Sequence, residues 1–285
     1  MILEEKYTLS NGIDIPKLGL GTWFISDRDV VKAVHDATSI GYRHIDTAQA
    51  YQNEKGVGEG IRSCGVDREK LFVTTKLAAE KKSYNDAVAS IDQSLKTLGL
   101  DYIDMMIIHS PKPWKNFLSD ERFFEGNREA WRALEEAYKA GKLRAIGLSN
   151  FQETDIDNIL ESCTVKPMVN QILVHISNTP EKLIQYCQDG NILVEAYSPI
   201  GHGELLKNRE VSDMADKYSV SVAQLGIRYD LQLGLLPLPK TANPHHMKTN
   251  SEVDFVISDK DMEFLKNMEQ IRDYGEASKF PVFAG

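Results

Sequence analysis

Four polar residues whose side chains can donate or direct a proton stand at or just after short apolar runs. They are Asp46, Tyr51, Lys76 and His109. Tyrosine is a poor acid at neutral pH because its ordinary pKa is about 10, but a nearby ammonium favours the phenolate and lowers that pKa. A carboxylate beside the lysine would keep the ammonium charged, and a histidine beside the tyrosine could orient a carbonyl oxygen. The four residues therefore predict a tuned proton donor that acts on a carbonyl group.

Each of these residues also has a purely structural interpretation. Asp46 could cap the helix that follows it, Lys76 could be solvated at a strand end, and His109 could be a packed, hydrogen-bonded histidine. Tyr51 could be an aromatic residue at a rim. Their arrival on consecutive predicted strands favours the catalytic interpretation.

Eight β-rich runs, separated by helical stretches, must bring these residues together. The runs span residues 17–23, 43–48, 71–76, 102–109, 144–150, 167–172, 191–198 and 235–240. Strands that alternate with helices predict a parallel sheet, and eight such units favour a closed α/β fold, the (β/α)8 or TIM barrel. A doubly wound sheet is the alternative, but no run is followed by the GxGxxG pattern of its nucleotide-binding turn.

A hairpin precedes these eight units. Residues 6–16 alternate apolar and polar side chains around Asn11-Gly12, which predicts a type I′ turn with positive φ at both positions. Because the hairpin falls outside the eight units, we expect it to plug the floor of the barrel.

Other signals mark helices. Ser83 with Asp86 is typical of a capping box, and Thr179 before Pro180 is typical of a helix start. The glycine-rich segment 56–60 is similar to a nucleotide loop, but it lies in a helical stretch with no strand before it. Close helix packing is therefore the favoured interpretation of these glycines.

Length and composition set the class of protein. The chain has 285 residues, of which 42% are hydrophobic and 26% are charged, and no linker-like tract interrupts it, so we expect one globular domain over residues 1–285. The net charge of −9 argues against a nucleic-acid partner. No run approaches the ~18 apolar residues of a membrane helix. The start, MILEEKYTLS, is unlike a signal peptide, and the three cysteines show no CxxC spacing, so we expect a cytoplasmic protein.

Polar residues also follow the later β-rich runs. In an α/β barrel the carboxyl ends of the strands share one face, where chemistry collects, so these residues predict a ligand-binding rim. They are Ser149, Asn150, Gln171, Tyr197, Ser198, Lys240 and Thr241. The long connection at residues 110–127 is expected to shape the mouth of the site. The rim offers no His-Cys set for zinc and no cluster of acids for another divalent ion, so no metal is expected.

The chain resembles the aldo-keto reductases over almost its whole length. The resemblance rests on GLGTW (19–23), GYRHIDTAQAYQNE (41–54), TTK (74–76), IIHSP (107–111), GKLRAIGLSNF (141–151), VNQI (169–172), AYSPIG (196–201) and LPKTANP (238–244). The bacterial members, including the 2,5-diketogluconate reductase-like group, are the most similar. The resemblance implies the barrel predicted above and NADPH bound without a Rossmann motif.

The resemblance also implies roles for matching residues. The family's catalytic tetrad falls on Asp46, Tyr51, Lys76 and His109. In that family the tyrosine is the acid, the lysine and the aspartate tune it, the histidine orients the substrate carbonyl, and the nicotinamide delivers hydride.

The implied cofactor contacts are spread along the rim. Tyr197 matches the aromatic that stacks on the nicotinamide. Ser149, Asn150 and Gln171 match the groups that hold its carboxamide. The remaining implied contacts are Thr22 and Asp46, Ser198 in the loop along the pyrophosphate, Lys240 and Thr241 at the 2′-phosphate, and Asn250 at the adenine.

One departure from the family pattern concerns the choice of cofactor. His246 stands where the family has an arginine, and Thr249 stands where an acid is usual. Arginine offers a permanent, bidentate charge, whereas histidine is mostly neutral at pH 7. The preference for NADPH is therefore weakened and NADH use is possible, although Lys240 supports NADPH.

The predicted substrate pocket is lined by Trp23, His109, Ser110 and Trp114. Trp114 could equally be a loop residue that packs on the barrel edge. Two aromatic residues common in the animal aldose reductases are absent here, and the C-terminal tail is short. We therefore expect an open pocket.

These observations together predict a monomeric enzyme that reduces small aldehydes, ketones or dicarbonyls to alcohols with NADPH. Two other functions stay open. Lys76 could form a Schiff base in a lyase, which would need a depressed pKa that Asp46 opposes. The chain could also be a non-catalytic NADP(H)-binding redox sensor, against which the intact tetrad argues.

Overall fold

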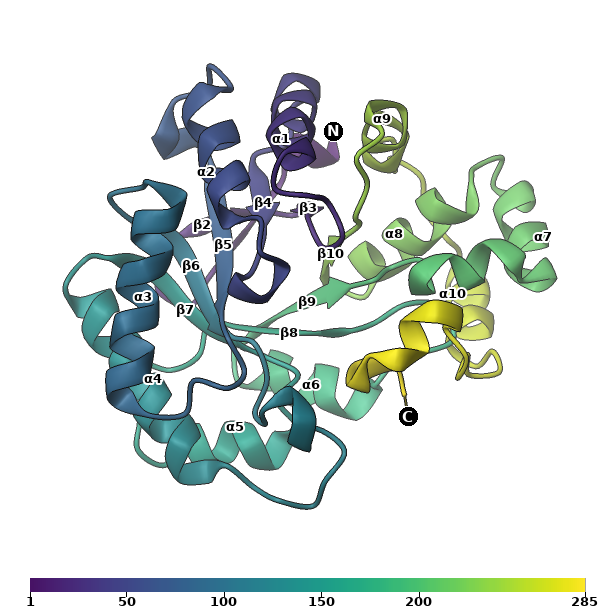
Figure 1. The fold of residues 1–285 in the computed structure, drawn as a ribbon. Coiled ribbons are helices and arrows are strands. Elements are labelled where there is room, and N and C mark those ends of the chain that lie inside the picture. The colour runs from purple at the N-terminus through teal and green to yellow at the C-terminus, as the bar shows by residue number, and fades with distance from the viewer. Residues whose placement is uncertain (285) are drawn as a thin grey trace.

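Parallel strands, hydrogen-bonded in chain order, form the centre of the computed structural model, which describes residues 1–284 (Figure 1). Within these residues the sheet has eight strands: β3 (Leu20–Gly21), β4 (His44–Asp46), β5 (Phe72–Leu77), β6 (Ile103–Ile108), β7 (Leu143–Ser149), β8 (Val169–Leu173), β9 (Leu193–Tyr197) and β10 (Leu236–Leu238). Gly21 N donates to Pro239 O at 3.0 Å, which joins β3 to the residue just after β10 and brings the two edges of the sheet together. Each predicted run overlaps one strand, and the predicted (β/α)8 barrel is confirmed.

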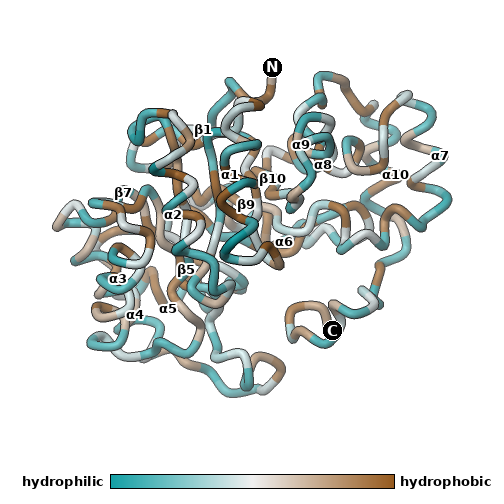
Figure 2. The backbone as a smooth tube through the Cα atoms, turned by 45° about the horizontal axis from the view of Figure 1, so that its top comes forward, coloured by the Kyte–Doolittle hydropathy of each residue, from teal (hydrophilic) through white to brown (hydrophobic). Residues whose placement is uncertain are grey.

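Helices surround the strands and connect them (Figure 1). They are α1 (Asp29–Ile40), α2 (Glu54–Ser63), α3 (Tyr84–Leu98), α4 (Phe124–Lys139), α5 (Glu153–Leu160), α6 (Glu181–Asp189), α7 (Arg209–Lys217), α8 (Val222–Gln232), α9 (Pro244–Ser251) and α10 (Asp259–Lys266). Hydrophobic and hydrophilic residues alternate along many of these helices (Figure 2), as in α1, where Val30, Val34 and Ala37 are buried. Within residues 1–284, no helix is both long and apolar enough to cross a bilayer.

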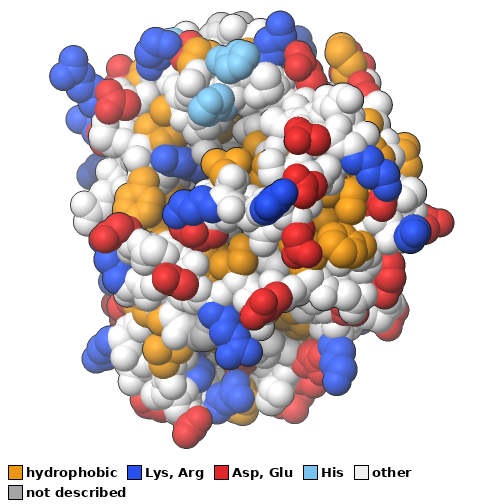
Figure 3. Space-filling view, turned by 90° about the vertical axis from the view of Figure 1, so that its right-hand side faces the viewer, with side chains coloured by type: hydrophobic (Ala, Val, Ile, Leu, Met, Phe, Trp, Pro, Cys, Tyr) orange, Lys and Arg blue, Asp and Glu red, His pale blue; other side chains and the backbone are white. Residues whose placement is uncertain are grey.

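The surface carries both signs of charge. On the face shown in Figure 3, acidic and basic side chains are interspersed and not gathered by sign. A second apolar cluster lies apart from the barrel core, where α7, α8 and α10 pack together through residues such as Val211, Leu225 and Leu265. These helices widen the molecule on the side of the late strands (Figure 1).

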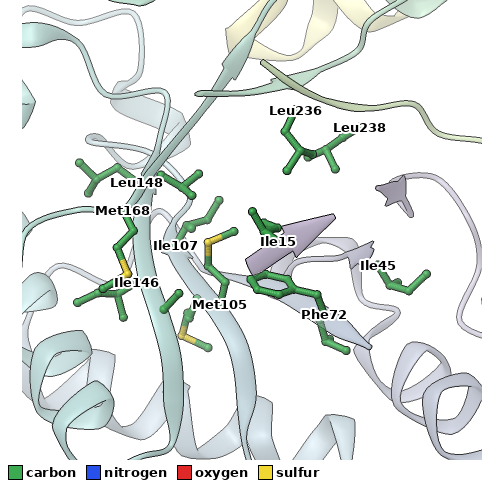
Figure 4. Packing of buried hydrophobic residues seen from close by; sticks show 14 of the residues in the cluster. Ile15, Ile45, Phe72, Met105, Ile107, Ile146, Leu148, Met168, Leu236 and Leu238 are labelled. Carbon is green, nitrogen blue, oxygen red and sulfur yellow. The ribbon is translucent and has the colours of Figure 1, made fainter. Parts of the chain in front are cut away.

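The hairpin of β1 (Lys6–Thr8) and β2 (Asp14–Pro16) closes the floor of the barrel, as predicted. Ile15 is fully buried and lies among Phe72, Met105 and Leu236 (Figure 4). Tyr7 ties the hairpin to the barrel because its hydroxyl donates to Leu235 O at 3.1 Å.

The predicted type I′ turn is wrong, because only Gly12 has a positive φ, of 83°. The Asn11 side chain explains the difference. Its Oδ1 accepts from Ile13 N at 3.1 Å, and its Nδ2 donates to Arg144 O at 3.0 Å. These bonds hold Asn11 with negative φ in an Asx-type turn and leave the left-handed position to glycine alone.

One predicted helix cap is confirmed and another is wrong. Ser83 Oγ accepts from Asp86 N at 3.2 Å and caps the start of α3. The predicted capping box is only half formed, because Asp86 Oδ2 accepts from Ser83 Oγ at 2.8 Å and not from the Ser83 backbone. Thr179 does not cap α6, which begins at Glu181 with Pro180 before it. The Thr179 hydroxyl instead lies 2.7 Å from the Tyr229 hydroxyl, and this tertiary hydrogen bond takes the place of the cap.

The glycines of segment 56–60 lie inside α2, where they permit close packing. A β-carbon at Gly58 would lie 1.9 Å from the carbonyl oxygen of Leu98, at the end of α3. A β-carbon at Gly56 would lie equally close to Asp27 O. The packing interpretation of this segment therefore accounts for its glycines.

Asp230 on α8 is a buried carboxyl without a partner. Neither of its oxygens has a hydrogen-bond partner among residues 1–284. Burial raises the pKa of Asp230 well above its ordinary value. The folded protein therefore favours the protonated form of this side chain.

We expect Asp230→Asn to stabilise the protein increasingly as the pH rises. Above the ordinary aspartate pKa of about 4, the folded chain keeps a proton that the unfolded chain releases. The free energy of unfolding of the wild-type protein therefore falls by about 1.4 kcal/mol per pH unit until the raised pKa is reached. Asparagine does not titrate, so the variant lacks this loss. Urea unfolding at pH 5 and pH 8, with the exposed Asp101→Asn as control, measures the difference from wild type. A difference independent of pH would contradict this expectation.

Candidate active site

A cavity of about 550 Å³ opens at the carboxyl ends of the strands. Its wall combines the ends of several strands with the loops that follow them and with the C-terminal tail (residues 273–284). Twelve of its lining residues were predicted, some from their place at strand ends and others, such as Thr22 and Trp23, from the family resemblance: Thr22, Trp23, Asp46, Tyr51, His109, Trp114, Ser149, Asn150, Gln171, Tyr197, Ser198 and Lys240.

The remaining predicted residues lie outside this lining. Lys76 is fully buried beneath it, and Asn250 is buried in α9. Thr241 and His246 lie beyond Lys240, and the His246 side chain is exposed. Ser110 is the clearest departure from prediction: it is fully buried and its Oγ accepts from Lys112 N at 3.2 Å, so the chain turns away from the cavity just after His109.

Lys76 and Asp46 form an ion pair inside the barrel. In the register of β4 and β5, Asp46 lies opposite Thr74, so Lys76 lies two residues further along on the same face and can reach back to the carboxylate. Lys76 Nζ donates to Asp46 Oδ1 and also to Thr47 O, the latter at 2.9 Å. Both side chains are almost completely buried.

This pair sets the charge of Lys76. Burial disfavours the ammonium, but the Asp46 carboxylate and Tyr51 outweigh burial, so the pKa of Lys76 is raised. A Schiff-base lysine needs a depressed pKa in order to be nucleophilic. The environment of Lys76 therefore opposes the lyase alternative.

Tyr51 closes the short 3-10 turn η2 (Gln49–Tyr51) that follows β4. Lys76 Nζ lies 4.9 Å from the centre of its ring. The expectation that the ammonium lowers the pKa of Tyr51 is wrong in its net direction. Burial raises the pKa of Tyr51 by more than Lys76 lowers it, and Asp46 raises it further. The phenol is therefore held in its protonated form at neutral pH.

His109 follows β6 and stands beside Tyr51, with 5.8 Å between their ring centres. Burial, and then the charge of Lys76, lower the pKa of His109 well below its ordinary value, so the ring is neutral. Its Nδ1 is buried without a partner among the described residues. A hydrogen on Nδ1 would have no acceptor, so the neutral ring favours the tautomer with its hydrogen on Nε2.

Amide and hydroxyl groups gather on the strands beyond His109. Asn150, with φ of 62°, donates through Nδ2 to His109 O at 3.0 Å and accepts from the Tyr197 hydroxyl at 2.7 Å. Gln171 Nε2 donates to Asp46 Oδ2 at 2.9 Å. These bonds join the neighbouring strand ends into one polar wall.

A cation lies at the rim of the cavity, and a helix begins four residues further along the chain. Lys240 lines the cavity at its exposed rim. Asn243 caps α9 because its Oδ1 accepts from His245 N at 2.9 Å. A cation beside the start of a helix is an arrangement that suits a phosphate group.

The C-terminal tail supplies lining residues that the sequence did not predict. Phe280, Val282 and Phe283 line the cavity, and the Phe280 ring lies 4.9 Å from that of Trp23. Phe283 also lies 4.4 Å, between ring centres, from His202 in the loop after β9. The short tail thus covers part of a pocket that was expected to be open. The aromatic residues of the tail were the sequence signal that could have predicted this coverage.

His175 anchors this tail. Burial lowers the pKa of His175 to about 4, so its ring is neutral. Its Nε2 accepts from the Tyr274 hydroxyl at 3.0 Å, and its Nδ1 lies 2.5 Å from Ile176 O. His175, two residues after the end of β8, therefore fixes the start of the segment that carries Phe280 and Phe283.

Comparison with known proteins agrees with this geometry. The model of the Aldo/keto reductase family matches residues 17–270. An uncharacterized oxidoreductase of Bacillus subtilis, YtbE, is 42% identical over 266 residues, which cover 91% of each chain. The glyoxal reductase of the same organism is 40% identical and covers 92% of this chain and 91% of its own. The crystal structure of a Bombyx mori aldo-keto reductase in complex with NADP has a TM-score of 0.84 at 32% identity and covers 99% of both chains.

Proposed function

Because this chain belongs to the aldo/keto reductase family, we propose that it reduces small aldehydes, ketones or dicarbonyls with NADPH and uses Tyr51 as the general acid. Membership makes it an oxidoreductase that acts on carbonyl compounds with a nicotinamide cofactor. The finer proposal is supported by one observation: a protonated phenol and a neutral imidazole line the cavity, and a buried ammonium lies directly beneath them.

The proton comes from Tyr51. Reduction of a carbonyl adds hydride to carbon and a proton to oxygen, and the nicotinamide, when bound, supplies the hydride. The Tyr51 hydroxyl gives its proton to the carbonyl oxygen as charge develops there, and Lys76 stabilises the phenolate that is left. Asp46 keeps Lys76 charged and aimed, because it accepts one of its three hydrogens.

His109 directs the substrate. A neutral ring with its hydrogen on Nε2 donates to the carbonyl oxygen and orients it toward Tyr51. The rings of Trp23 and Trp114 stand beside this point, and Phe280 and Phe283 complete an apolar wall. Such a wall suits small carbonyl compounds with little charge, and the name of the glyoxal reductase relative supports dicarbonyls as the first substrates to test.

The polar wall fits a nicotinamide cofactor. Ser149, Asn150 and Gln171 offer hydroxyl and amide groups to the carboxamide, and Tyr197 offers an aromatic face. Thr22 and Ser198 line the same cavity. The cation of Lys240, with Thr241 and the start of α9, suits the 2′-phosphate that distinguishes NADPH from NADH, and Asn250 is assigned to the adenine by resemblance alone.

The whole chain is proposed to act as one domain and as a monomer. The cavity is lined by residues from Gly21 to Phe283, so distant parts of one chain complete it. Trp23 and Phe283, near the two ends of the chain, have ring centres 6.1 Å apart. The site as described therefore needs no residue from a second copy.

We expect Tyr51→Phe to lower the NADPH-dependent reduction of methylglyoxal by a factor of about 100 to 10,000, because general acid catalysis contributes that much. NADPH binding, followed by quenching of tryptophan fluorescence, should stay close to wild type. Tyr186→Phe, which removes a hydroxyl from α6 outside the cavity, is the control. Near-normal turnover by Tyr51→Phe would refute the acid assignment. Tight NADPH binding by wild type with no turnover of any carbonyl would instead support the sensor alternative.

We expect His246→Arg to lower the KM for NADPH by about tenfold and to leave the KM for NADH unchanged. The arginine would add a permanent, bidentate partner for the 2′-phosphate, and a charge-assisted hydrogen bond is worth about 1.5–3 kcal/mol. Steady-state kinetics with both cofactors measures the effect. His245→Arg, one residue away on the same exposed helix start, is the control for charge alone. An equal gain from both variants would contradict a specific role for position 246.

A further inference from the structure

Glu195 on β9 is a carboxyl group inside the barrel that none of the roles above uses. It is fully buried, and its Oε2 accepts from Gln171 Nε2 at 2.7 Å. Its other oxygen, Oε1, is buried without a partner among residues 1–284. Burying a carboxyl group with only one hydrogen bond lowers the free energy of unfolding. Glu195 therefore destabilises the fold relative to an apolar residue at this position.

That contact is made to a side chain of the cavity wall. Gln171 and Glu195 lie opposite each other in the register of β8 and β9, and Gln171 lines the cavity. The same Gln171 nitrogen also donates to Asp46 Oδ2 at 2.9 Å. An amide nitrogen carries two hydrogens, so Asp46 and Glu195 together use both of them.

The two acceptors decide which way the amide faces. A flipped amide would place its oxygen against the Asp46 carboxylate, which can only accept hydrogen bonds. Two hydrogen bonds hold the amide nitrogen inside the barrel. The amide oxygen Oε1 is therefore the polar atom of Gln171 that remains available to a ligand in the cavity. One bond, to Asp46 alone, would leave the amide free to turn about that contact.

We propose that Glu195 is a positioning residue that fixes the Gln171 amide with its oxygen toward the cavity, so that this position accepts a hydrogen bond from the carboxamide N–H of the nicotinamide. This inference rests on the proposed cofactor site. It assigns to Gln171 the role of acceptor, which the carboxamide N–H of a nicotinamide can satisfy and a methyl ketone cannot.

The protonation of Glu195 is compatible with this role. Burial, and then the nearby Asp46, raise the pKa of Glu195 to about 8, so the group is mostly neutral at pH 7. A protonated carboxyl keeps one oxygen that accepts a hydrogen bond. Glutamine, which is neutral, similar in shape and also has one accepting oxygen, should therefore replace Glu195 with little loss.

The test compares two oxidised cofactors that differ at the group in question. NADP⁺ carries the carboxamide, whereas 3-acetylpyridine adenine dinucleotide phosphate carries a methyl ketone with no N–H. Dissociation constants for both, from isothermal titration calorimetry, give a discrimination ratio that does not depend on turnover. A net hydrogen bond of about 1 kcal/mol predicts that wild type binds the acetylpyridine analogue about fivefold more weakly.

Variants at position 195 should lower this ratio when they remove the acceptor and keep it when they retain one. Glu195→Met removes the acceptor but keeps the length of the side chain, so the ratio should fall below about twofold. Glu195→Leu should give the same result and replaces the methionine variant if that variant is poorly folded. Glu195→Gln should keep the wild-type ratio. Glu54→Gln is the control, because Glu54 is another buried carboxyl, bonded to Thr75 Oγ1 at 2.7 Å between α2 and β5.

Each outcome decides the inference. A ratio that stays near fivefold in Glu195→Met and Glu195→Leu would overturn it, as would a loss in Glu195→Gln equal to that in Glu195→Met. A wild-type ratio near one would also overturn it, because Gln171 would then accept nothing from the carboxamide. The proposed reductase function would survive that result if NADPH still drives reduction of methylglyoxal, so the two failures can be told apart.

Discussion

Lys76 and Asp46 form an ion pair at a depth in the barrel where neither charge could be kept alone. Removing one partner of such a buried pair typically costs about 3–5 kcal/mol, because the other charge is left uncompensated. The pair is possible only where two adjacent parallel strands hold both side chains on one face, and it touches the other parts of the site through Tyr51 and Gln171. The barrel therefore supports the site by burying this pair away from solvent and by holding both side chains in place.

Much of the fold could be predicted from sequence, because its signals are local. Each predicted strand is a run of β-formers that must be buried on both faces, and each overlaps a strand of the structure. The errors arose where a side chain had a distant partner. Asn11 bonds to Arg144 and Thr179 to Tyr229, and these contacts overrode the turn and the cap that local pattern alone favoured.

The same distinction separates the predictable and unpredictable parts of the site. Residues at strand ends, such as His109 and Gln171, were predictable because the topology of a barrel brings such positions to one face. The coverage by the tail was not, since it depends on His175 holding Tyr274. Nor was the net pKa shift of Tyr51: proximity to Lys76 predicts a decrease, but the extent of burial, which the sequence does not give, reverses it.

The most direct test of the central claim is the ionisation of Tyr51 in the free protein. With ¹³Cζ-labelled tyrosine, the NMR signal missing from Tyr51→Phe identifies the residue, and its shift is followed from pH 6 to pH 11. We expect Tyr51 to remain protonated above pH 10, the ordinary midpoint for tyrosine. In Lys76→Met the midpoint should be higher still, because the ammonium that lowers the pKa of Tyr51 is gone. A phenolate at pH 8 in the wild-type protein would contradict a buried, protonated acid at this site.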